Sequence, residues 1–438
     1  MPERCVLAYS GGLDTSVAVA WIRETYGYDV VTCTADLGNV ADLNAVQQKA
    51  IASGAAKAVV VDARDVFVTF FVWPALQAGA LYQDKYPLAT ALGRPLIAKL
   101  LVDTARDEGA KYVAHGSTGK GNDQVRFDLA VHALAPDLVV VAPMRGGMNM
   151  SREEEMAYAK QRAIPVPVTK KSPYSVDENL WGRSIEAGVL EDPWQAPPRD
   201  VYQWTVDPNE APERPSVAVV GFEQGVPVSL DGKPLTGPAL IEALNALAGK
   251  HGVGRIDMVE DRLVGIKSRE IYEAPAAVTL HAAHMALEEM VLSRDVQRFK
   301  RQVAQEYARV VYEGLWFSAH HQDLAAYVRS TQRFVSGEVK LQLHRGAVTV
   351  VGRKSPNALY QEALATYSKA DRFDHKAAEG FITVFGLPLR TQARAQRLWA
   401  ADDTAALDVP RRAIEAPASA PAVKRKQRAS QPRPKLGR

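Results

Sequence analysis

The segment that decides the fold is AYSGGLDTS, residues 8–16, which follows an apolar run near the start of the chain. Its adjacent glycines, Gly11 and Gly12, allow the backbone to turn tightly and to approach an anion closely. The loop amides and the start of a following helix add positive potential. Further hydrogen-bond donors are the hydroxyls of Ser10, Thr15 and Ser16. The segment is therefore predicted to bind phosphate at the carboxyl end of a first parallel strand.

Asp14 is the one acidic residue in this segment. A carboxylate suits an anion-binding loop if Mg²⁺ accompanies the phosphates, or if it accepts from loop amides and holds the turn. The loop is not a Walker A motif, because no GK[ST] follows the glycines. A short SGG could also be a plain turn between a strand and a serine-capped helix.

Short apolar runs alternate with amphipathic stretches around this loop. Helices are expected at residues 15–24 and, after a capping box formed by Ser151 and Glu154, at residues 152–162. Strands are expected at residues 5–9, 30–35, 58–62, 112–115 and 138–142. This alternation is typical of a doubly wound, mostly parallel α/β sheet.

The pattern changes near residue 172, and prolines gather between residues 193 and 215. Beyond them the sequence predicts hairpins and a mostly helical stretch, at residues 221–235, 337–355 and 274–316. We therefore expect three parts: a first domain over 1–171, an α+β domain over 172–403 that ends in a helical region, and a basic disordered tail over 404–438.

Composition and charge are those of an ordinary globular protein, with 47% hydrophobic and 24% charged residues. The formal charge of the whole chain is +3. The tail contains nine Lys or Arg and only two acidic residues, so the remaining residues 1–403 carry a net charge of about −4. No nucleic-acid partner is expected. With no long apolar run and no secretory signal, we expect no membrane span and a cytoplasmic location. Cys5 and Cys33 are predicted to be packed thiols rather than a disulfide.

A second polar loop, HGSTGKGNDQVRFDL at residues 115–129, also follows a strand and leads into a helix. Asp123 can accept an ammonium group, whereas Thr118, Asn122 and Arg126 can bind carboxylates. This set suits an amino-acid ligand at the same sheet edge as the first loop. The alternative is a polar turn that caps the helix at Asn122 or Asp123, but capping explains neither the Gly-Lys-Gly step nor Arg126.

AYSGGLDTS resembles the SGGxDS loop of the ATP pyrophosphatases, the PP-loop group, which cleave ATP between the α- and β-phosphates. From residue 4 to residue 396 the chain resembles the argininosuccinate synthase family. Further matching segments are ALYQDKYPLATALGRPLIAK at 80–99, SPYSVDENLWGRSIEAG at 172–188 and AGKHGVGRIDMVEDRLVGIKSREIYEAPA at 248–276.

This resemblance implies an AMP-forming ligase of arginine biosynthesis that uses ATP and Mg²⁺ to join citrulline and aspartate through a citrullyl-adenylate. It makes the first domain a PP-loop ATP-binding domain, and the second a synthetase and oligomerisation domain. It also implies a homotetramer, with the helical region ahead of the tail as the expected contact between subunits.

The resemblance also implies roles for individual residues. The ATP-binding residues are Ala8, Tyr9, Ser10, Gly11, Gly12, Leu13, Asp14, Thr15 and Ser16, with Ala35 and Gly116. Aspartate is expected to bind Thr118, Asn122 and Asp123. Citrulline is expected to bind Tyr86, Thr90, Ala91, Asn122, Arg126, Ser175, Ser184, Glu260 and Tyr272. Catalysis is expected to depend on positioning and charge more than on proton transfer. The residues expected to carry it are Ser10, Asp14, Asp123 and Arg126.

Several positions differ from the family pattern. Asn39 stands where Gln is usual, and at positions 89 and 93 the small residues Ala89 and Gly93 replace other small residues. APMRGGMNM at 142–150 replaces a stretch that usually contains tryptophan. These changes leave open a specialised homologue that acts on another ureido compound or amine. A non-catalytic nucleotide-binding scaffold is a further alternative, which the intact polar residues of the two loops disfavour. The histidines at 281, 284, 320 and 321 lack zinc spacing, so no metal site is predicted from them.

Overall fold

The computed structural model describes residues 2–148, 150–165 and 173–396. The predicted tail at 404–438 lies outside these residues. Contacts between residues divide the chain into one compact unit over Met1–Gln361 and a second over Glu362–Arg438. The domain boundary at 171/172 stays a prediction. None of the described helices is long and apolar enough to cross a membrane.

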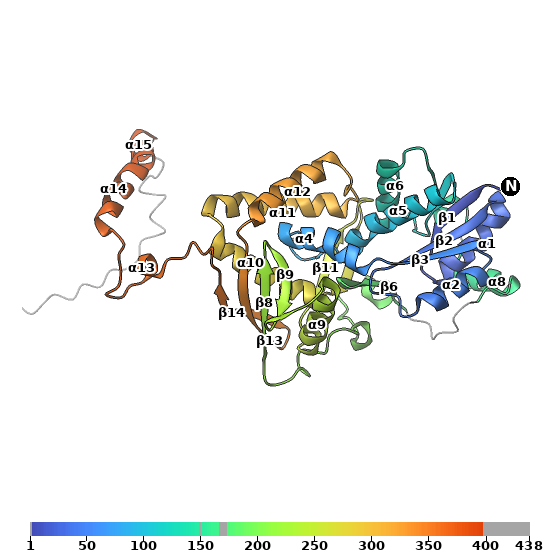
Figure 1. Ribbon diagram of the computed structural model, residues 1–438, viewed down its shortest axis with the longest axis horizontal. Coiled ribbons are helices and arrows are strands. Elements are labelled where there is room, and N and C mark those ends of the chain that lie inside the picture. Colours follow the sequence, from blue (N-terminus) through green and yellow to red (C-terminus); the bar gives the residue numbers. More distant parts are fainter. Residues whose placement is uncertain (1, 149, 166–172, 397–438) are drawn as a thin grey trace, which may run out of the picture. The chain divides into compact units, whose positions relative to one another are not determined.

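The first part of the chain forms the predicted parallel sheet (Figure 1). All five strands pair in parallel, in the order β3-β2-β1-β4-β5. They are β1 (Arg4–Ala8), β2 (Asp29–Asp36), β3 (Lys57–Asp62), β4 (Tyr112–Ala114) and β5 (Val139–Val141). The predicted doubly wound α/β class is confirmed, and the expected strand ends differ from these by at most one residue. The strand order reverses between β1 and β4, which is where such sheets bind ligands.

Helices cover both faces of this sheet (Figure 1). They are α1 (Leu13–Tyr26), α2 (Leu43–Ala52), α5 (Ala89–Asp107), α6 (Asp123–Leu134), the short α7 (Pro143–Gly146) and α8 (Arg152–Gln161). Cys5 and Leu7 of β1 pack with α1 and α8, whereas Val6 between them packs with α5 and α6. This alternation follows from the period of two in a strand. Both cysteines are buried free thiols, as predicted.

Two helix ends show how the sequence sets local structure. Helix α1 begins at Leu13, earlier than expected, and ends before Gly27, which adopts a left-handed φ of 70° and donates its N–H to the carbonyl of Arg23. The predicted capping box of α8 is present, because Ser151 Oγ accepts from the Glu154 N–H and the Glu154 carboxylate accepts from the Ser151 N–H.

The second part of the chain is α+β, as expected, and contains two antiparallel sheets with orders β10-β9-β8-β13-β14 and β11-β12-β7-β6. Their strands are β6 (Ser175–Asn179), β7 (Gly182–Glu186), β8 (Ser216–Glu223), β9 (Val226–Leu230), β10 (Lys233–Pro234), β11 (Arg255–Asp261), β12 (Lys267–Glu273), β13 (Gly337–His344) and β14 (Ala347–Lys354). The long helices are α9 (Gly237–Lys250), α10 (Pro275–Val291), α11 (Arg294–Tyr312) and α12 (Ala319–Gln332). The hairpin predicted at 337–355 and the helical stretch predicted at 274–316 are both confirmed.

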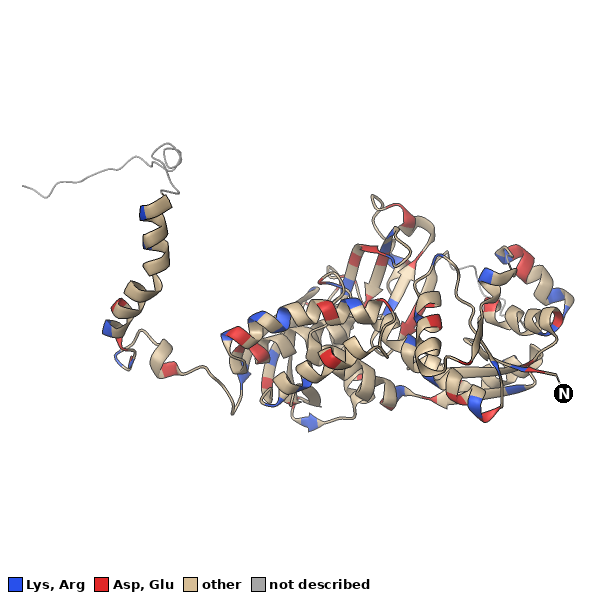
Figure 2. Ribbon diagram, turned by 90° about the horizontal axis from the view of Figure 1, so that it is seen from above, with Lys and Arg blue, Asp and Glu red and all other residues tan. Residues whose placement is uncertain are grey.

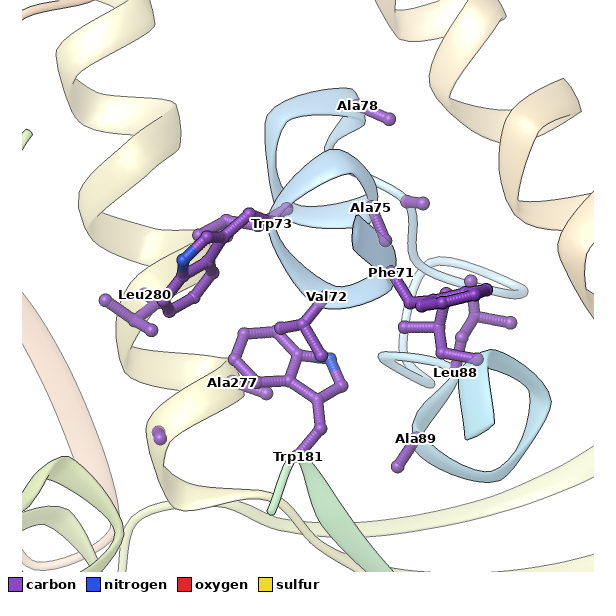
Figure 3. Close-up of a cluster of buried hydrophobic side chains, with 14 of the residues drawn as sticks. Phe71, Val72, Trp73, Ala75, Ala78, Leu88, Ala89, Trp181, Ala277 and Leu280 are labelled. Carbon is purple, nitrogen blue, oxygen red and sulfur yellow. The ribbon is translucent and has the colours of Figure 1, made fainter. Parts of the chain in front are cut away.

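A large buried core joins an early segment of the chain to this second part. The segment contains α3 (Arg64–Phe67), a π-helical turn (Val68–Val72) and α4 (Trp73–Ala78). Trp73 of α4 meets Trp181 edge to face, with ring centroids 6.2 Å apart, and Leu280 of α10 packs in the same cluster (Figure 3). Segments far apart in sequence therefore share one core.

The turn between β6 and β7 is held against the start of α5. Trp181 Nε1 donates to the carbonyl of Pro87 at 2.9 Å, and Asn179 Nδ2 donates to the carbonyl of Ala89 at 2.8 Å. Leu180 also donates its backbone N–H to the carbonyl of Leu37 at 2.8 Å. These bonds place the β6–β7 hairpin beside Tyr86 and Thr90.

The second unit contains the described helices α13 (Glu362–Ala365), α14 (His375–Phe385) and α15 (Leu387–Gln396). Six large apolar side chains of α14 and α15 are mostly exposed: Phe381, Ile382, Val384, Phe385, Leu387 and Leu389. In the first unit, basic and acidic residues alternate along the described helices and strands (Figure 2).

Candidate active site

The two predicted loops lie at the same carboxyl edge of the parallel sheet, because β1 and β4 are neighbours there. They open into a cleft of about 930 Å³. Most of the predicted ATP residues line this cleft: Ala8, Tyr9, Ser10, Gly12, Leu13, Asp14, Thr15, Ala35 and Gly116. The structure thus brings together residues from three strand ends, as expected for a nucleotide site in such a sheet.

Gly11 and Ser16 shape the loop from behind instead of lining the cleft. Gly11 has a φ of 75°, and its carbonyl accepts a hydrogen bond from Lys49 Nζ of α2. Ser16 Oγ donates to the carbonyl of Gly12 at 2.7 Å and lies 2.9 Å from the Tyr9 hydroxyl. A side chain at Gly12 would crowd Ser10, because its Cβ would lie 3.3 Å from Ser10 Oγ.

The start of α1 offers free backbone donors to the cleft. Its N-cap residue is Gly12, which makes no side-chain capping bond, so the first amides of the helix stay available. Ser10 Oγ and Thr15 Oγ1 lie 3.2 Å apart at the same place. Amides, hydroxyls and the helix dipole together make this an anion site.

Asp14 lies exposed at the cleft and contacts Glu155 of α8, whose side chain is buried. Burial first, and then the Asp14 carboxylate, raise the pKa of Glu155 to about 8. Within the described residues no loop amide donates to Asp14, so the turn is held without its carboxylate.

His115 fixes the second loop. Its Nδ1 accepts from the Ser117 N–H at 3.2 Å, which leaves the proton on Nε2, and Nε2 donates to Asp128 Oδ1 at 3.0 Å. Arg145 lies in the 142–150 stretch that differs from the family pattern, and its Nη2 donates to the other oxygen of Asp128 at 2.7 Å. Both ring nitrogens are engaged, so His115 positions the loop and is not a free base.

Asp123 lies between two guanidinium groups. Arg126 Nη1 donates to Oδ1 at 2.9 Å, and Arg94 Nη2 donates to Oδ2 at 2.7 Å. Burial raises the pKa of the Asp123 carboxyl, but Arg94 and Arg126 outweigh it and hold that pKa below its usual range. Arg94 also bonds Asp177 of β6 and so links the loop to the second part of the chain. Asp123 is therefore ionised at neutral pH.

Most of the predicted citrulline residues form a compact, largely buried cluster next to Asp123. Glu260 accepts 2.5 Å bonds from the hydroxyls of Tyr272 and Tyr312, one on each oxygen. The rings of Tyr86 and Tyr272 stack with centroids 4.2 Å apart. Tyr86 Oη accepts from the Thr90 N–H at 2.9 Å, and Thr90 Oγ1 lies 3.1 Å from Ser184 Oγ, a residue of β7.

Asn122 connects the two predicted amino-acid sites. The alternative of a turn that caps the helix holds in position only: Asn122 is the N-cap residue of α6, but its side chain makes no capping bond. Instead, Asn122 Nδ2 donates to the Tyr312 hydroxyl at 2.8 Å, and its Oδ1 accepts from the Leu263 N–H at 2.9 Å. The amide spans from the first sheet to the β11–β12 loop.

Three predicted residues lie apart from this cluster. Ser175 is exposed on β6, pairs with Glu186 and lines the cleft, whereas Ser184 pairs with Asp177. Thr118 is exposed in the second loop, and the Ala91 side chain is buried in the core. Sequence reasoning missed Tyr312 and Arg94. Arg94 lay inside a matching segment, but nothing in the sequence distinguished Tyr312 from other aromatics of the helical stretch.

The positions that differ from the family pattern lie at the edge of the cleft or behind the site. Asn39 lines the cleft. A side chain at Gly93 would press on Leu37, since its Cβ would lie 3.0 Å from Leu37 Cδ1, and a Cβ at Gly182 would lie 3.2 Å from that of Ala89. Of the 142–150 stretch, none of the described residues 142–148 and 150 lines the cleft. Among described residues, no group of three or more His, Cys, Asp or Glu could hold a metal ion.

Comparison with known proteins adds an independent finding. A model of the arginosuccinate synthase N-terminal HUP domain matches residues 4–165, and one of the arginosuccinate synthase C-terminal domain matches residues 174–392. An argininosuccinate synthase of Dehalococcoides mccartyi is 55% identical over 396 residues, which cover 90% of this chain and 97% of the relative. That of Symbiobacterium thermophilum is 56% identical, with 90% and 98% covered.

A third relative, the argininosuccinate synthase of Chlorobaculum tepidum, is 55% identical over 390 residues, with 89% and 97% covered. Among solved structures, a U34-tRNA thiolase of Methanococcus maripaludis aligns with a TM-score of 0.26 and 14% identity over 40% of this chain and 60% of its own. That likeness is too slight to bear on function.

Proposed function

Because the chain belongs to the argininosuccinate synthase family, ligases of arginine biosynthesis, we propose that it joins citrulline to aspartate with cleavage of ATP to AMP and pyrophosphate. The observation that carries this proposal is the meeting of two sites at one sheet edge. A cleft with an anion-binding loop lies beside two separate carboxylates, the partly buried Asp123 and the buried Glu260, which can bind two amino-acid ammonium groups.

In the first step the ureido oxygen of citrulline attacks the α-phosphorus of ATP, and pyrophosphate leaves. In the second the amine of aspartate attacks the ureido carbon and expels AMP. Ser10, Thr15 and the first amides of α1 would stabilise phosphate charge, a role that their donors at the uncapped start of the helix support. Glu260 and Arg126 suit the ammonium and carboxylate of citrulline, and Asp123 suits the ammonium of aspartate. The ammonium of aspartate must lose one proton before its nitrogen attacks, and the departing AMP phosphate or solvent can take it, because both ring nitrogens of His115 are engaged.

Mg²⁺ is proposed to enter with ATP. Magnesium in such sites keeps several waters and binds through one or two carboxylates together with substrate phosphates. The donors fit this mode and not a protein-only site, because Asp14 is a carboxylate of the phosphate loop facing the cleft and no larger ligand group exists among the described residues. When bound, the ion would neutralise phosphate charge.

The test is an assay with ATP, Mg²⁺, citrulline and aspartate. We expect AMP, pyrophosphate and argininosuccinate in equal amounts, and pyrophosphate exchange into ATP with citrulline alone. Absence of AMP above a control without aspartate would overturn the proposal. Replacing citrulline by other ureido acids in the same assay tests the specialised homologue. Nucleotide binding without turnover would indicate the scaffold.

Lys49→Met is expected to weaken ATP binding, because it removes the ammonium donor under the Gly11 carbonyl and frees the loop. Loss of one hydrogen bond from a charged donor corresponds to a rise of about tenfold in the KM for ATP, with little change in the KM for aspartate. Steady-state kinetics measure this. Lys57→Met, which removes an exposed ion pair with Glu108, is the matched control; equal effects of the two changes would refute the expectation.

We also propose that the second unit contributes to a homotetramer. Phe381 and Phe385 stack with centroids 5.2 Å apart on α14, within an exposed apolar set that single helices in water do not keep uncovered. Replacing both by Glu is expected to reduce the molar mass in light scattering to that of a smaller assembly. Lys376→Glu, on the same helix, should leave the mass unchanged. An unchanged mass for the double variant would remove α14 from the contact.

A further inference from the structure

One tyrosine outside the predicted site residues touches three residues of the proposed amino-acid sites. Tyr312 is the last residue of α11 and is 1% exposed. Its hydroxyl donates to Glu260 Oε1 at 2.5 Å and accepts from Asn122 Nδ2 at 2.8 Å. Its backbone carbonyl accepts from Arg126 Nε at 2.9 Å, and its ring lies 4.8 Å from the Arg126 guanidinium carbon.

This arrangement matters because Glu260 is buried, with 3% of its surface exposed. A buried carboxylate keeps its charge only if donors or cations face it. Burial raises the pKa of Glu260, and the hydrogen bonds from Tyr272 and Tyr312 act against that rise. The charged and titratable groups around it are Arg126, Arg262, Glu270, Tyr82, Tyr86, Tyr272 and Tyr312.

Tyr312 also decides how the Asn122 amide points. The amide has two anchors, the Tyr312 hydroxyl on its nitrogen and the Leu263 N–H on its oxygen. With both in place the amide cannot flip without losing two hydrogen bonds. Stacking of the Tyr82 ring on that of Tyr312, with centroids 3.6 Å apart, fixes the phenol from behind.

We propose that Tyr312 is a positioning residue for citrulline, which fixes the Glu260 carboxylate for the α-ammonium group and orients the Asn122 amide between the two amino-acid sites. This inference rests on the proposed function and deepens it. The alternative is that Tyr312 only fills space. Tyr307 can distinguish these two roles, because it lies on the same helix, is 0% exposed, and its hydroxyl has no hydrogen-bond partner among the described residues.

The experiment compares Tyr312→Phe with Tyr307→Phe in the full-length enzyme, by citrulline-dependent exchange of pyrophosphate into ATP without aspartate. Loss of a hydrogen bond to a charged group predicts a rise of about tenfold or more in the KM for citrulline for Tyr312→Phe. The KM for ATP should change by less than about twofold in either variant, which is less than the loss of one hydrogen bond to ATP would cause. Tyr307→Phe should match the parent enzyme in both constants.

The pH dependence of kcat/KM for citrulline is a second measurement, and a residue that only fills space would not change it. Without the Tyr312 hydroxyl the pKa of Glu260 rises further, so its carboxylate is protonated at a higher pH and the acid limb of kcat/KM for citrulline moves to higher pH. The position of this limb does not depend on the fraction of folded protein. An unchanged KM for citrulline, an unmoved limb or equal effects of the two substitutions would overturn the inference. Absence of exchange in the parent enzyme would instead overturn the proposed function.

Discussion

Asp123→Asn is expected to stop the aspartate step while sparing the formation of the adenylate. The carboxylate has a lowered pKa and lies between Arg94 and Arg126, so it is charged at neutral pH and can bind the ammonium of aspartate. An amide has no charge to offer. Losing one partner of a buried charge pair costs about 2–5 kcal/mol, which corresponds to a fall of roughly 30-fold to 5,000-fold in kcat/KM for aspartate.

The two half-reactions separate this effect from general damage. Citrulline-dependent exchange of pyrophosphate into ATP does not need aspartate, so we expect the variant to keep it within about tenfold of the parent. The matched control is Asp103→Asn, which removes an exposed carboxylate paired with Lys99 on α5. Equal loss of exchange and of argininosuccinate formation would show that Asp123 supports the whole site and not the aspartate step.

The fold of the first part could be predicted because its causes are local. Each buried strand is a short apolar run followed by a polar turn, and a parallel sheet must bury both faces. The placement of residues 64–78 could not be predicted. Their apolar side chains fit any core, and only the packing of Trp73 against Trp181 assigns them to the core shared with the second part.

The site shows the same division. The phosphate loop was predictable, because glycines, hydroxyls and a helix start are adjacent in sequence and act together. The role of Tyr312 was not, since it bonds Asn122 from 190 residues away. For the same reason the alternative of a helix cap held in position only: Asn122 is the N-cap residue of α6, but its side chain binds the distant partners Tyr312 and Leu263 instead of the helix amides.

Glu273→Gln is expected to lower the stability of the first unit more than any of the other single substitutions of polar residues described above. Glu273 ends β12, next to Tyr272, and is 0% exposed. Its carboxylate accepts five hydrogen bonds of 2.7–3.0 Å, from Arg183, from the backbone of Gln203, Trp204 and Thr205, and from the Thr205 hydroxyl. These bonds hold a loop that has no regular structure of its own.

Glutamine has nearly the same shape, but its amide nitrogen is a donor and must face donors whichever way it turns. The change also leaves the buried Arg183 guanidinium without this counter-charge. Breaking a buried ion pair on one side costs about 3–5 kcal/mol, and we expect a correspondingly large fall in Tm in calorimetry. Glu289→Gln, which removes a partly exposed pair with Arg353, should cost less than about 1 kcal/mol. If both variants lowered Tm equally, the five donors would not be what holds the loop, and the burial of Glu273 would need another cause.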